Sequence, residues 1–251
     1  MKSVAIQEIF ASIQGEGPWV GERHIFVRFM GCDLRCVYCD TPAAVQIETD
    51  DRTGNPCRVQ TAAGVNGYDK VPNPVSSADL TEFCSRLIIP GPSRPTLSLT
   101  GGEPLLQCSF LVEWLPLVKQ RFRIYLETSG IHANAMLRLR DMVDVVSMDF
   151  KLPSATGLRP FWEEHNEFLS AARGRSIVVK AVVTKNTTRE DLLTAARILA
   201  DFDTSIPLVI QPAGGQFAPE SSMLMAFQDA ALRIIEHVRV IPQTHKILNV
   251  L

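Results

Sequence analysis

Short apolar runs alternate with amphipathic segments along most of the 251-residue chain. The apolar runs are rich in valine, isoleucine and leucine, which is typical of strands buried in a parallel sheet. They predict strands at residues 4–13, 25–31, 96–100, 123–128, 143–150, 176–184 and 206–212. Because strands and helices alternate, we expect right-handed crossovers and an α/β fold class. About six parallel strands are too few for a closed eight-stranded barrel, so the prediction is a partial, open barrel.

Three apolar stripes with helical spacing lie between these strands. Ser76 and Asp79 precede the first stripe and resemble a capping box, which predicts that a helix begins there. The stripes consist of Leu80, Phe83 and Leu87; of Leu192, Ala196 and Leu199; and of Leu224, Phe227, Ala231, Ile234 and Val238.

Residues 44–75 break the alternation, because they are rich in glycine, proline, asparagine and aspartate. A segment of this length without clear periodicity is usually functional or flexible. It directly follows a cluster of cysteines, so it could fold over a site there, and a solvated insertion is an equally weighted alternative. Residues 1–251 are expected to form a single domain that carries this insertion.

The composition suits a globular protein, with 46% apolar and 21% charged residues. A formal net charge of −2 argues against a broad nucleic-acid-binding surface, although a small basic pocket is compatible with it. The N-terminus shows no signal peptide, and no apolar run approaches the ~18 residues that span a bilayer. We therefore expect a cytoplasmic protein without nucleic-acid or membrane partners, whose cysteines are ligands or core residues rather than disulfides.

Cys32, Cys36 and Cys39 lie in the stretch GCDLRCVYCDTP with the spacing Cys-x3-Cys-x2-Cys, and no fourth cysteine completes the set. Thiolates suit zinc, copper(I) and iron–sulfur clusters, but a structural zinc site needs four ligands. Three cysteines suit a [4Fe–4S] cluster better, because they leave one iron open for another ligand. An open iron can chelate the amino and carboxylate groups of S-adenosylmethionine (SAM). The spacing of the other three cysteines suggests no second cluster.

Polar segments end four of the predicted strands: TGGEP at 100–104, ETSG at 127–130, SMDFK at 147–151 and QPAGG at 211–215. Ligands of parallel α/β folds bind at the carboxyl ends of the strands, so we expect these segments to line one pocket. Two glycines in the first segment let the backbone approach a ligand closely. Asp149 and Lys180 are charged residues late in buried strands, and an internal ion pair between them explains them almost as well as a function.

The cysteine spacing, with Tyr38 just before the last cysteine, resembles the signature of the radical SAM superfamily. The Gly-Gly-Glu-Pro segment at 101–104 resembles the superfamily segment that binds the methionine end of SAM. This resemblance implies a partial TIM-like barrel, a [4Fe–4S] cluster, and SAM as the source of a 5′-deoxyadenosyl radical. It also implies an electron donor such as a flavodoxin or a ferredoxin.

Three segments resemble one family of this superfamily more closely: EIFASIQGEGPWVG at 8–21, FVRFMGCDLRCVYCDTP at 26–42 and RVIPQTHKILNVL at 239–251. They are similar to the 7-carboxy-7-deazaguanine synthases of queuosine and 7-deazapurine biosynthesis. The resemblance covers most of the chain and is weakest at residues 44–75. It implies a homodimeric lyase that converts 6-carboxy-5,6,7,8-tetrahydropterin into 7-carboxy-7-deazaguanine with loss of ammonia. The hydrogen at C6 would be abstracted and later returned from 5′-deoxyadenosine, which regenerates SAM.

The same resemblance implies the roles of individual residues. Cys32, Cys36 and Cys39 would hold the cluster, and the Thr41 hydroxyl would bind a Mg²⁺ ion beside the substrate carboxylate. The residues implied in SAM binding are Gly102, Ser129, Ser147, Met148, Asp149, Gln211, Pro212, Ala213 and Gly214. The residues implied in substrate binding are Ile13, Gln14, Gly15, Arg28, Thr100, His245 and the C-terminal Leu251. Many family members have Ser-Pro-Lys where this chain has SMDFKLP, so either Asp149 or Lys151 fills the equivalent place.

The chemistry of Arg28 supports its implied role, because a guanidinium can clamp a carboxylate in bidentate fashion. A surface salt bridge is the alternative for this residue. For the whole chain, two other functions stay open: a glycyl-radical activase, which shares the cysteine spacing, and a structural zinc module. The segments QGEG and PQTHK speak against an activase, since that enzyme would need a protein partner.

Overall fold

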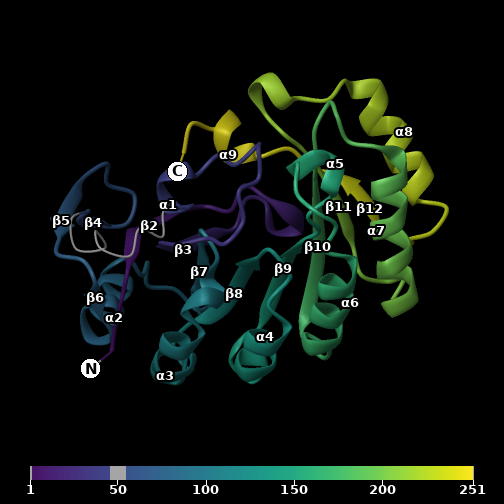
Figure 1. Cartoon of the computed structure of the whole chain (residues 1–251). Coiled ribbons are helices and arrows are strands. Elements are labelled where there is room, and N and C mark those ends of the chain that lie inside the picture. Colours follow the sequence, from purple (N-terminus) through teal and green to yellow (C-terminus); the bar gives the residue numbers. More distant parts are fainter. Residues whose placement is uncertain (1, 46–54, 251) are drawn as a thin grey trace.

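The computed structural model describes residues 2–45 and 55–250, in which the strands form two sheets (Figure 1). The strands are β1 (Ser3–Val4), β2 (Ile6–Ile13), β3 (Arg23–Phe29), β4 (Cys57–Gln60), β5 (Tyr68–Val71), β6 (Val75–Ser76), β7 (Thr96–Gly101), β8 (Arg123–Thr128), β9 (Val145–Asp149), β10 (Ser176–Val183), β11 (Leu208–Pro212) and β12 (Val238–Val240). The main sheet has the order β12-β11-β10-β9-β8-β7-β3-β2-β4-β5, and β1 pairs with β6. The run from β12 to β3 is parallel, whereas β2 is antiparallel to β3.

The main sheet is an open, partial barrel, because its edge strands β12 and β5 do not pair with each other in the described structure. All seven strands that the apolar runs predict are present, as β2, β3 and β7 to β11. Every residue of β9 is buried, including Ser147 and Asp149. The expected α/β class and open barrel are therefore confirmed.

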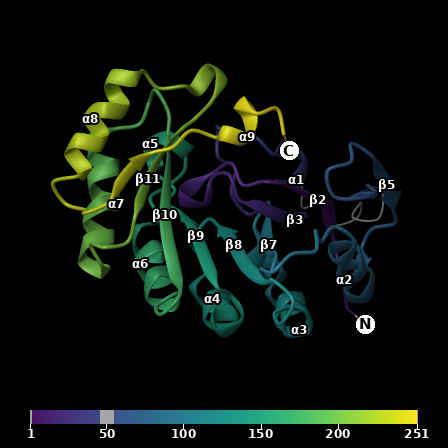
Figure 2. The same ribbon diagram turned by 180° about the vertical axis from the view of Figure 1, so that it is seen from behind.

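Helices cover the outer face of the parallel strands, and Figures 1 and 2 show α3, α4, α6 and α7 along it. The helices are α1 (Pro42–Val45), α2 (Ser77–Arg86), α3 (Cys108–Val118), α4 (Ala133–Leu139), α5 (Pro153–Thr156), α6 (Trp162–Ala171), α7 (Arg189–Phe202), α8 (Ser221–Ala231) and α9 (Thr244–Ile247), with 3₁₀ turns η1 (Gly17–Trp19), η2 (Pro104–Gln107), η3 (Arg140–Met142) and η4 (Gly215–Phe217). The capping box is confirmed, because the Asp79 amide donates to Ser76 Oγ at 3.2 Å. Within residues 2–45 and 55–250, no helix is long and apolar enough to cross a membrane.

The third predicted stripe is only partly a helix. Helix α8 ends at Ala231, where the Leu232 amide still bonds to the Gln228 carbonyl, and Ile234 lies in the following turn. Val238 belongs to strand β12, which pairs with β11. The prediction that Val238 continues the helix was wrong, because a short buried edge strand places apolar residues at spacings that also fit a helical stripe.

The described part of the 44–75 insertion extends the sheet. Strand β4 pairs with β2 through Glu8 and Arg58, and β5 pairs with β4. The buried Asn73 side chain bonds to both the amide and the carbonyl of Ile6. Residues 46–54 lie outside the described structure, so the expectation of a cover over the site is not tested for them.

The turn between β2 and β3 reaches the far strands of the sheet. In Figure 1 this hairpin (purple) points toward β10, and α9 lies near it. The turn is closed by two backbone bonds between Gln14 and the segment 21–22, of 2.8 and 2.9 Å. The Thr244 amide of α9 donates to the Gly15 carbonyl at 2.9 Å. The N- and C-terminal segments therefore meet at one place on the barrel.

Candidate active site

A cavity of about 570 Å³ lies at the carboxyl ends of the parallel strands. It brings together most of the residues that the sequence singles out. The predicted cofactor and metal residues on its wall are Cys32, Cys36, Cys39, Thr41, Gly102, Ser129, Ser147, Asp149, Gln211, Ala213 and Gly214. The predicted substrate residues on its wall are Ile13, Gln14, Gly15, Arg28, Thr100 and His245.

Two predicted SAM residues do not face the cavity with their side chains. Met148 is fully buried, and its side chain packs beneath Gly130, where a Cβ atom would approach Met148 Cγ to 2.5 Å. Pro212 is likewise absent from the wall, whereas Gln211 and Ala213 line it. Successive side chains of a strand point to opposite faces, so neighbours of a lining residue can offer only backbone atoms. Leu251 lies outside the described residues.

The cysteine loop follows β3 directly and is held by backbone hydrogen bonds. The Gly31 amide donates to the Ala44 carbonyl at 2.7 Å, and the Val37 amide donates to the Thr156 carbonyl at 3.1 Å. Burial raises the pKa of Cys32 to about 11 and also raises that of Cys36. Ligation requires thiolates, so a bound metal centre must supply the positive charge that stabilises them here.

The three cysteines of this loop match the donor set of a cluster that keeps one iron open. An iron–sulfur cluster takes one thiolate per iron, so its cysteines stand farther apart than the ligands of one zinc ion. Three cysteines on one wall of a cavity fit that arrangement.

The Gly-Gly-Glu-Pro segment packs tightly on the cysteine loop. A Cβ atom at Gly102 would lie 2.1 Å from the Gly31 carbonyl oxygen, and Gly101 has a φ of 123°. The buried Glu103 carboxylate accepts bonds from the Leu105 amide, the Thr128 hydroxyl and the Ser129 amide at 2.7–3.0 Å. Glu103 therefore joins the ends of β7 and β8 instead of facing the cavity.

Gly102→Ala is expected to displace the cysteine loop, because the added methyl group meets backbone that cannot rotate away. Overpacking of this kind costs about 1–3 kcal/mol. The free energy of unfolding, measured with urea, and the iron content after reconstitution should both be lower than in wild type. Gly91→Ala is the matched control, since a Cβ there meets nothing within 4 Å. Equal stability and iron content in Gly102→Ala and Gly91→Ala would refute the close approach of Gly102 to the Gly31 carbonyl.

Four buried polar atoms on the cavity wall lack a hydrogen-bond partner in the described part of the chain. They are Tyr38 Oη of the cysteine loop, and Ser129 Oγ, Asp149 Oδ1 and Gln211 Oε1 from the ends of β8, β9 and β11. Buried polar atoms are nearly always paired in proteins, so these atoms indicate a ligand. SAM carries an ammonium group, ribose hydroxyls and an adenine amino group, all of which can donate to such oxygens. The wall therefore fits SAM.

Asp149 and Lys151 form one ion pair on this wall, with Lys151 Nζ 2.6 Å from Asp149 Oδ2. Burial alone would lower the pKa of Lys151, but the Asp149 carboxylate outweighs it and raises that pKa well above its ordinary value. Both residues line the cavity, where they lie as a pair. The alternative of an Asp149–Lys180 ion pair was wrong, because Lys180 pairs with Glu16.

Another part of the cavity wall is built around Glu127. Gln14 Nε2 donates to Glu127 Oε1 at 2.9 Å, and Thr100 Oγ1 donates to Glu127 Oε2 at 2.6 Å. Each carboxylate oxygen keeps acceptor capacity after these bonds. Gln14 and Thr100 are predicted substrate residues, and the structure shows that a carboxylate from β8 links them.

Arg28 faces the cavity from β3 and is held at one end. Its Nε donates to Glu8 Oε1 at 2.9 Å, and its guanidinium lies 5.7 Å from the Phe10 ring centre. In the described residues, the terminal nitrogens of Arg28 make no hydrogen bond to another protein group. Glu8 thus fixes the side chain while the fork stays available to a carboxylate in the cavity.

Thr41 and His245 lie on the rim. Thr41 Oγ1 is 3.9 Å from Cys39 Sγ, so the predicted Mg²⁺ ligand adjoins a predicted cluster ligand. His245 packs on Gly15, where a Cβ atom would lie 2.2 Å from His245 Nδ1. Burial lowers the pKa of His245, so the ring is neutral at pH 7.

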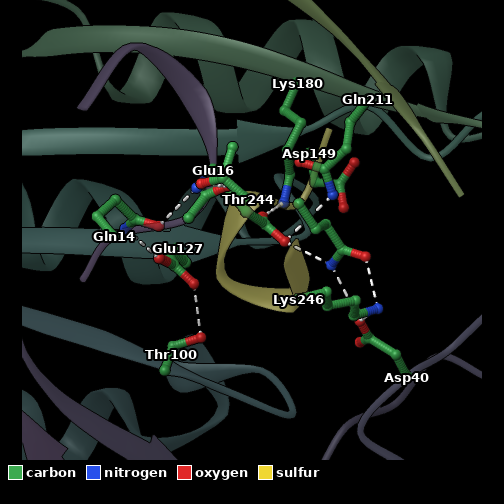
Figure 3. A network of polar contacts seen from close by, with 12 residues as sticks. Gln14, Glu16, Asp40, Thr100, Glu127, Asp149, Lys180, Gln211, Thr244 and Lys246 are labelled. Carbon is green, nitrogen blue, oxygen red and sulfur yellow. Dashed lines mark hydrogen bonds and ion pairs between the residues drawn. The ribbon is translucent and has the colours of Figure 1, made fainter. Parts of the chain in front are cut away.

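Figure 3 shows a network of polar contacts around the cavity. It joins the hairpin turn, the strand ends, the cysteine loop and the C-terminal segment. Glu16 is its centre and forms an ion pair with Lys180 of β10. Its Oε1 accepts from Gln243 Nε2 at 2.7 Å and from Gln211 Nε2 at 3.2 Å. Burial alone would raise the pKa of Glu16, but the Lys180 ammonium outweighs it and lowers that pKa. Lys180 shows the converse, because the Glu16 carboxylate outweighs burial and raises its pKa.

The network continues to the cysteine loop. Asp40 Oδ2 accepts from Gln243 Nε2 at 2.9 Å and from Lys246 Nζ at 2.7 Å. Burial alone would raise the pKa of Asp40, but the hydrogen bonds from Lys246 and Gln243 lower it to about 2. Asp40 stands between Cys39 and Thr41, so the C-terminal segment fixes the loop that carries both.

Sequence reasoning did not single out Glu16, Asp40, Glu127, Gln243 or Lys246 as individual residues, although each lines the cavity. All five lie inside the segments QGEG, CDTP, ETSG and PQTHK, so their positions were visible while their partners were not. Hydrogen bonds such as that from Gln243 to Glu16 span 227 residues, and local spacing carries no signal for them.

Comparison with known proteins matches residues 26–205 to the model of the radical SAM superfamily. A 7-carboxy-7-deazaguanine synthase of Geobacter sulfurreducens is 37% identical over 250 residues, which cover 97% of this chain and 96% of that protein. A 7-carboxy-7-deazaguanine synthase of Methanopyrus kandleri is 33% identical over 247 residues, which cover 97% of this chain and 93% of that protein.

Two solved structures share the fold. The crystal structure of QueE from Escherichia coli superposes with a TM-score of 0.61 and 22% identity, covering 96% of this chain and 94% of that one. The structure of TYW1 with a lysine-pyruvate adduct bound gives a TM-score of 0.53 and 13% identity, covering 84% of this chain and 73% of that one. Both agree with the open barrel described above.

Proposed function

Because the chain belongs to the radical SAM superfamily, and within it to the 7-carboxy-7-deazaguanine synthase family, we propose that it converts 6-carboxy-5,6,7,8-tetrahydropterin into 7-carboxy-7-deazaguanine with loss of ammonia. The product belongs to queuosine and 7-deazapurine biosynthesis. The enzyme is therefore a carbon–nitrogen lyase with a [4Fe–4S] cluster, SAM and Mg²⁺ as cofactors.

One observation supports this proposal above the others. A single cavity is lined by the three cysteines, the polar strand ends, the hairpin turn, Arg28 and the C-terminal segment. An enzyme that transfers hydrogen between SAM and a pterin needs both molecules in one enclosed space, held in fixed orientation.

Residues at the strand ends would hold the cofactors. Cys32, Cys36 and Cys39 would bind the cluster, while Ser129 Oγ and the Asp149–Lys151 pair would bind SAM. The bound cluster and SAM supply the one-electron chemistry that starts the reaction. The chain itself orients these groups and shields them from bulk water.

Residues around Arg28 and Glu127 would hold the substrate. The Arg28 fork would bind the substrate carboxylate, and Mg²⁺ at Thr41 would neutralise the same group. The Glu127 carboxylate, aligned by Gln14 and Thr100, would accept N–H groups of the pterin ring.

Arg28→Ala is expected to raise the KM for the carboxy-tetrahydropterin, because it removes the charged partner of the substrate carboxylate. Truncating one side of such a pair costs about 2 kcal/mol or more, which is roughly a thirtyfold change in KM. Arg58→Ala is the matched control, because Arg58 also approaches Glu8, at 3.6 Å, but is not on the cavity wall. Steady-state kinetics with unchanged KM in Arg28→Ala would remove Arg28 from the substrate site.

Partners follow from the cofactors in a coarser way. A radical SAM enzyme needs a small-molecule substrate and a reductant, and we propose a flavodoxin or ferredoxin for the latter. The free thiols of the described cysteines suit a reducing compartment, which supports placement in the cytoplasm. The homodimer stays a prediction from the family resemblance.

An anaerobic assay with reconstituted protein, SAM, reductant and Mg²⁺ tests the function. Ammonia should be released from the carboxy-tetrahydropterin and not from the same pterin without its carboxylate. Release of 5′-deoxyadenosine without ammonia would retain the radical SAM chemistry and overturn the proposed substrate.

A further inference from the structure

His165 lies outside the cavity wall but directly behind it. It belongs to α6, its side chain is 0% exposed, and its ring packs edge-on against Phe150 with ring centres 4.6 Å apart. Neither the cysteine motif nor the family resemblance singles this residue out. A buried histidine is costly unless both ring nitrogens have partners, so its hydrogen bonds are informative.

Both ring nitrogens of His165 bond to backbone at the ends of two neighbouring strands. Nδ1 lies 2.9 Å from the Gly130 carbonyl oxygen, and the Lys151 amide donates to Nε2 at 3.0 Å. An amide N–H can only donate, so Nε2 is the acceptor and Nδ1 carries the proton. Burial lowers the pKa of His165 to about 4, which keeps the ring in this neutral form at pH 7.

The two backbone groups belong to the segments that present unpartnered atoms to the cavity. Gly130 follows Ser129, and Lys151 lies two residues beyond Asp149. Ser129 Oγ and Asp149 Oδ1 are two of the buried cavity atoms without a protein partner in the described residues. His165 thus links the two strand ends, with one hydrogen bond to each.

We infer that His165 is a positioning residue for SAM, which sets the spacing between Ser129 and Asp149 without touching the cofactor. This inference rests on the proposed placement of SAM at the ends of β8 and β9. Groups behind the ligating residues typically change affinity by about 10–100-fold when they are removed. Loss of the two His165 hydrogen bonds should therefore weaken SAM binding. The KM for the pterin should stay unchanged, because Arg28 is held by Glu8 and Glu127 is held by Gln14.

His165→Leu removes both bonds at similar volume, and His165→Gln retains an amide that can replace one of them. Phe168→Leu is the matched control, because Phe168 is equally buried on the same helix and has an apolar side chain. The measurements on cluster-loaded protein are the Kd for SAM by equilibrium dialysis and the change that SAM causes in the electron paramagnetic resonance spectrum of the reduced cluster. Thermal unfolding reports the loss of stability separately.

His165→Leu is expected to raise the Kd for SAM about 10–100-fold, with His165→Gln between it and wild type. Phe168→Leu should lower the melting temperature without changing that Kd. A Kd in His165→Leu or His165→Gln equal to that in Phe168→Leu would show that His165 is only structural and overturn the inference. Unchanged SAM affinity in both Ser129→Ala and Asp149→Asn would instead overturn the placement of SAM, and the role of His165 with it.

Discussion

Replacing Cys36 with alanine is expected to abolish turnover and to remove most of the iron, while the protein stays folded. Two thiolates cannot hold a [4Fe–4S] cluster in the way that three do. The loop itself does not depend on the metal, because the amides of Gly31 and Val37 bond to the carbonyls of Ala44 and Thr156. Iron content, the visible absorption of the reconstituted protein and circular dichroism measure the two effects.

Cys84→Ala is the matched control for this result. Cys84 is fully buried in the core and is not on the cavity wall. Its substitution should leave iron content unchanged and reduce stability slightly, as expected for a small cavity. Equal iron loss in both variants, or full iron in Cys36→Ala, would contradict the assignment of the cluster.

Replacing Lys180 with methionine is expected to destabilise the protein by about 3–5 kcal/mol, because it leaves the Glu16 carboxylate buried without its counter-charge. The side chains of Lys180 and Glu16 are only 13% and 17% exposed. For a domain of this size, the melting temperature should fall by roughly 6–20 °C. Differential scanning calorimetry and urea unfolding give the two values.

Lys2→Met provides the control, since the Lys2–Glu113 pair is 52% and 57% exposed. A solvent-exposed pair contributes about 0–1 kcal/mol, so this variant should be close to wild type. The double variant Glu16→Gln/Lys180→Met should recover part of the loss, because no buried charge remains unpaired. Equal stability of Lys180→Met and Lys2→Met would show that the buried pair is not formed.

The pH dependence of the Lys180→Met effect follows from the two shifts. The pKa of Glu16 is lowered from 4.5, so its contribution is present above pH 4.5 and is lost as the pH falls below it. The pKa of Lys180 is raised from 10.5, so its contribution is complete below that pH. The free energy of unfolding should therefore differ most between wild type and Lys180→Met at pH values between 4.5 and 10.5. This difference should become smaller below pH 4.5.

Local patterns were enough to predict the strands and the cluster loop. Buried strands such as β10 leave segments rich in valine and isoleucine, and three cysteines on one loop must lie near one another whatever the rest of the chain does. The same logic failed for Val238, where three residues of edge strand β12 mimic the end of a helical stripe. Short segments satisfy both periods, and only pairing with β11 decides between them.

Long-range partners could not be predicted, because they depend on which strand ends meet. An ion pair between Lys180 and Asp149 was one of two alternatives from the sequence, and the two residues are direct neighbours across β9 and β10. In the structure Lys180 forms an ion pair with Glu16 of the β2–β3 hairpin, and Asp149 forms one with Lys151. Local sequence showed that these charges were buried, but it did not contain the geometry that assigns their partners.

Side-chain direction separates residues that a motif treats alike. The segment 147–149 is predicted to bind SAM, and the structure turns Ser147 and Asp149 toward the cavity and Met148 into the core. This alternation follows from the strand itself, so Met148 can contribute only backbone atoms to that binding.

The central claim is that SAM and the pterin share one cavity, and hydrogen transfer between them tests it most directly. Anaerobic turnover of substrate carrying deuterium at C6, with products analysed by mass spectrometry, makes that transfer visible. We expect 7-carboxy-7-deazaguanine, ammonia, and deuterium recovered in the SAM pool, because both molecules would share the same 570 Å³ space. Formation of product with no deuterium in SAM or 5′-deoxyadenosine would contradict the shared cavity.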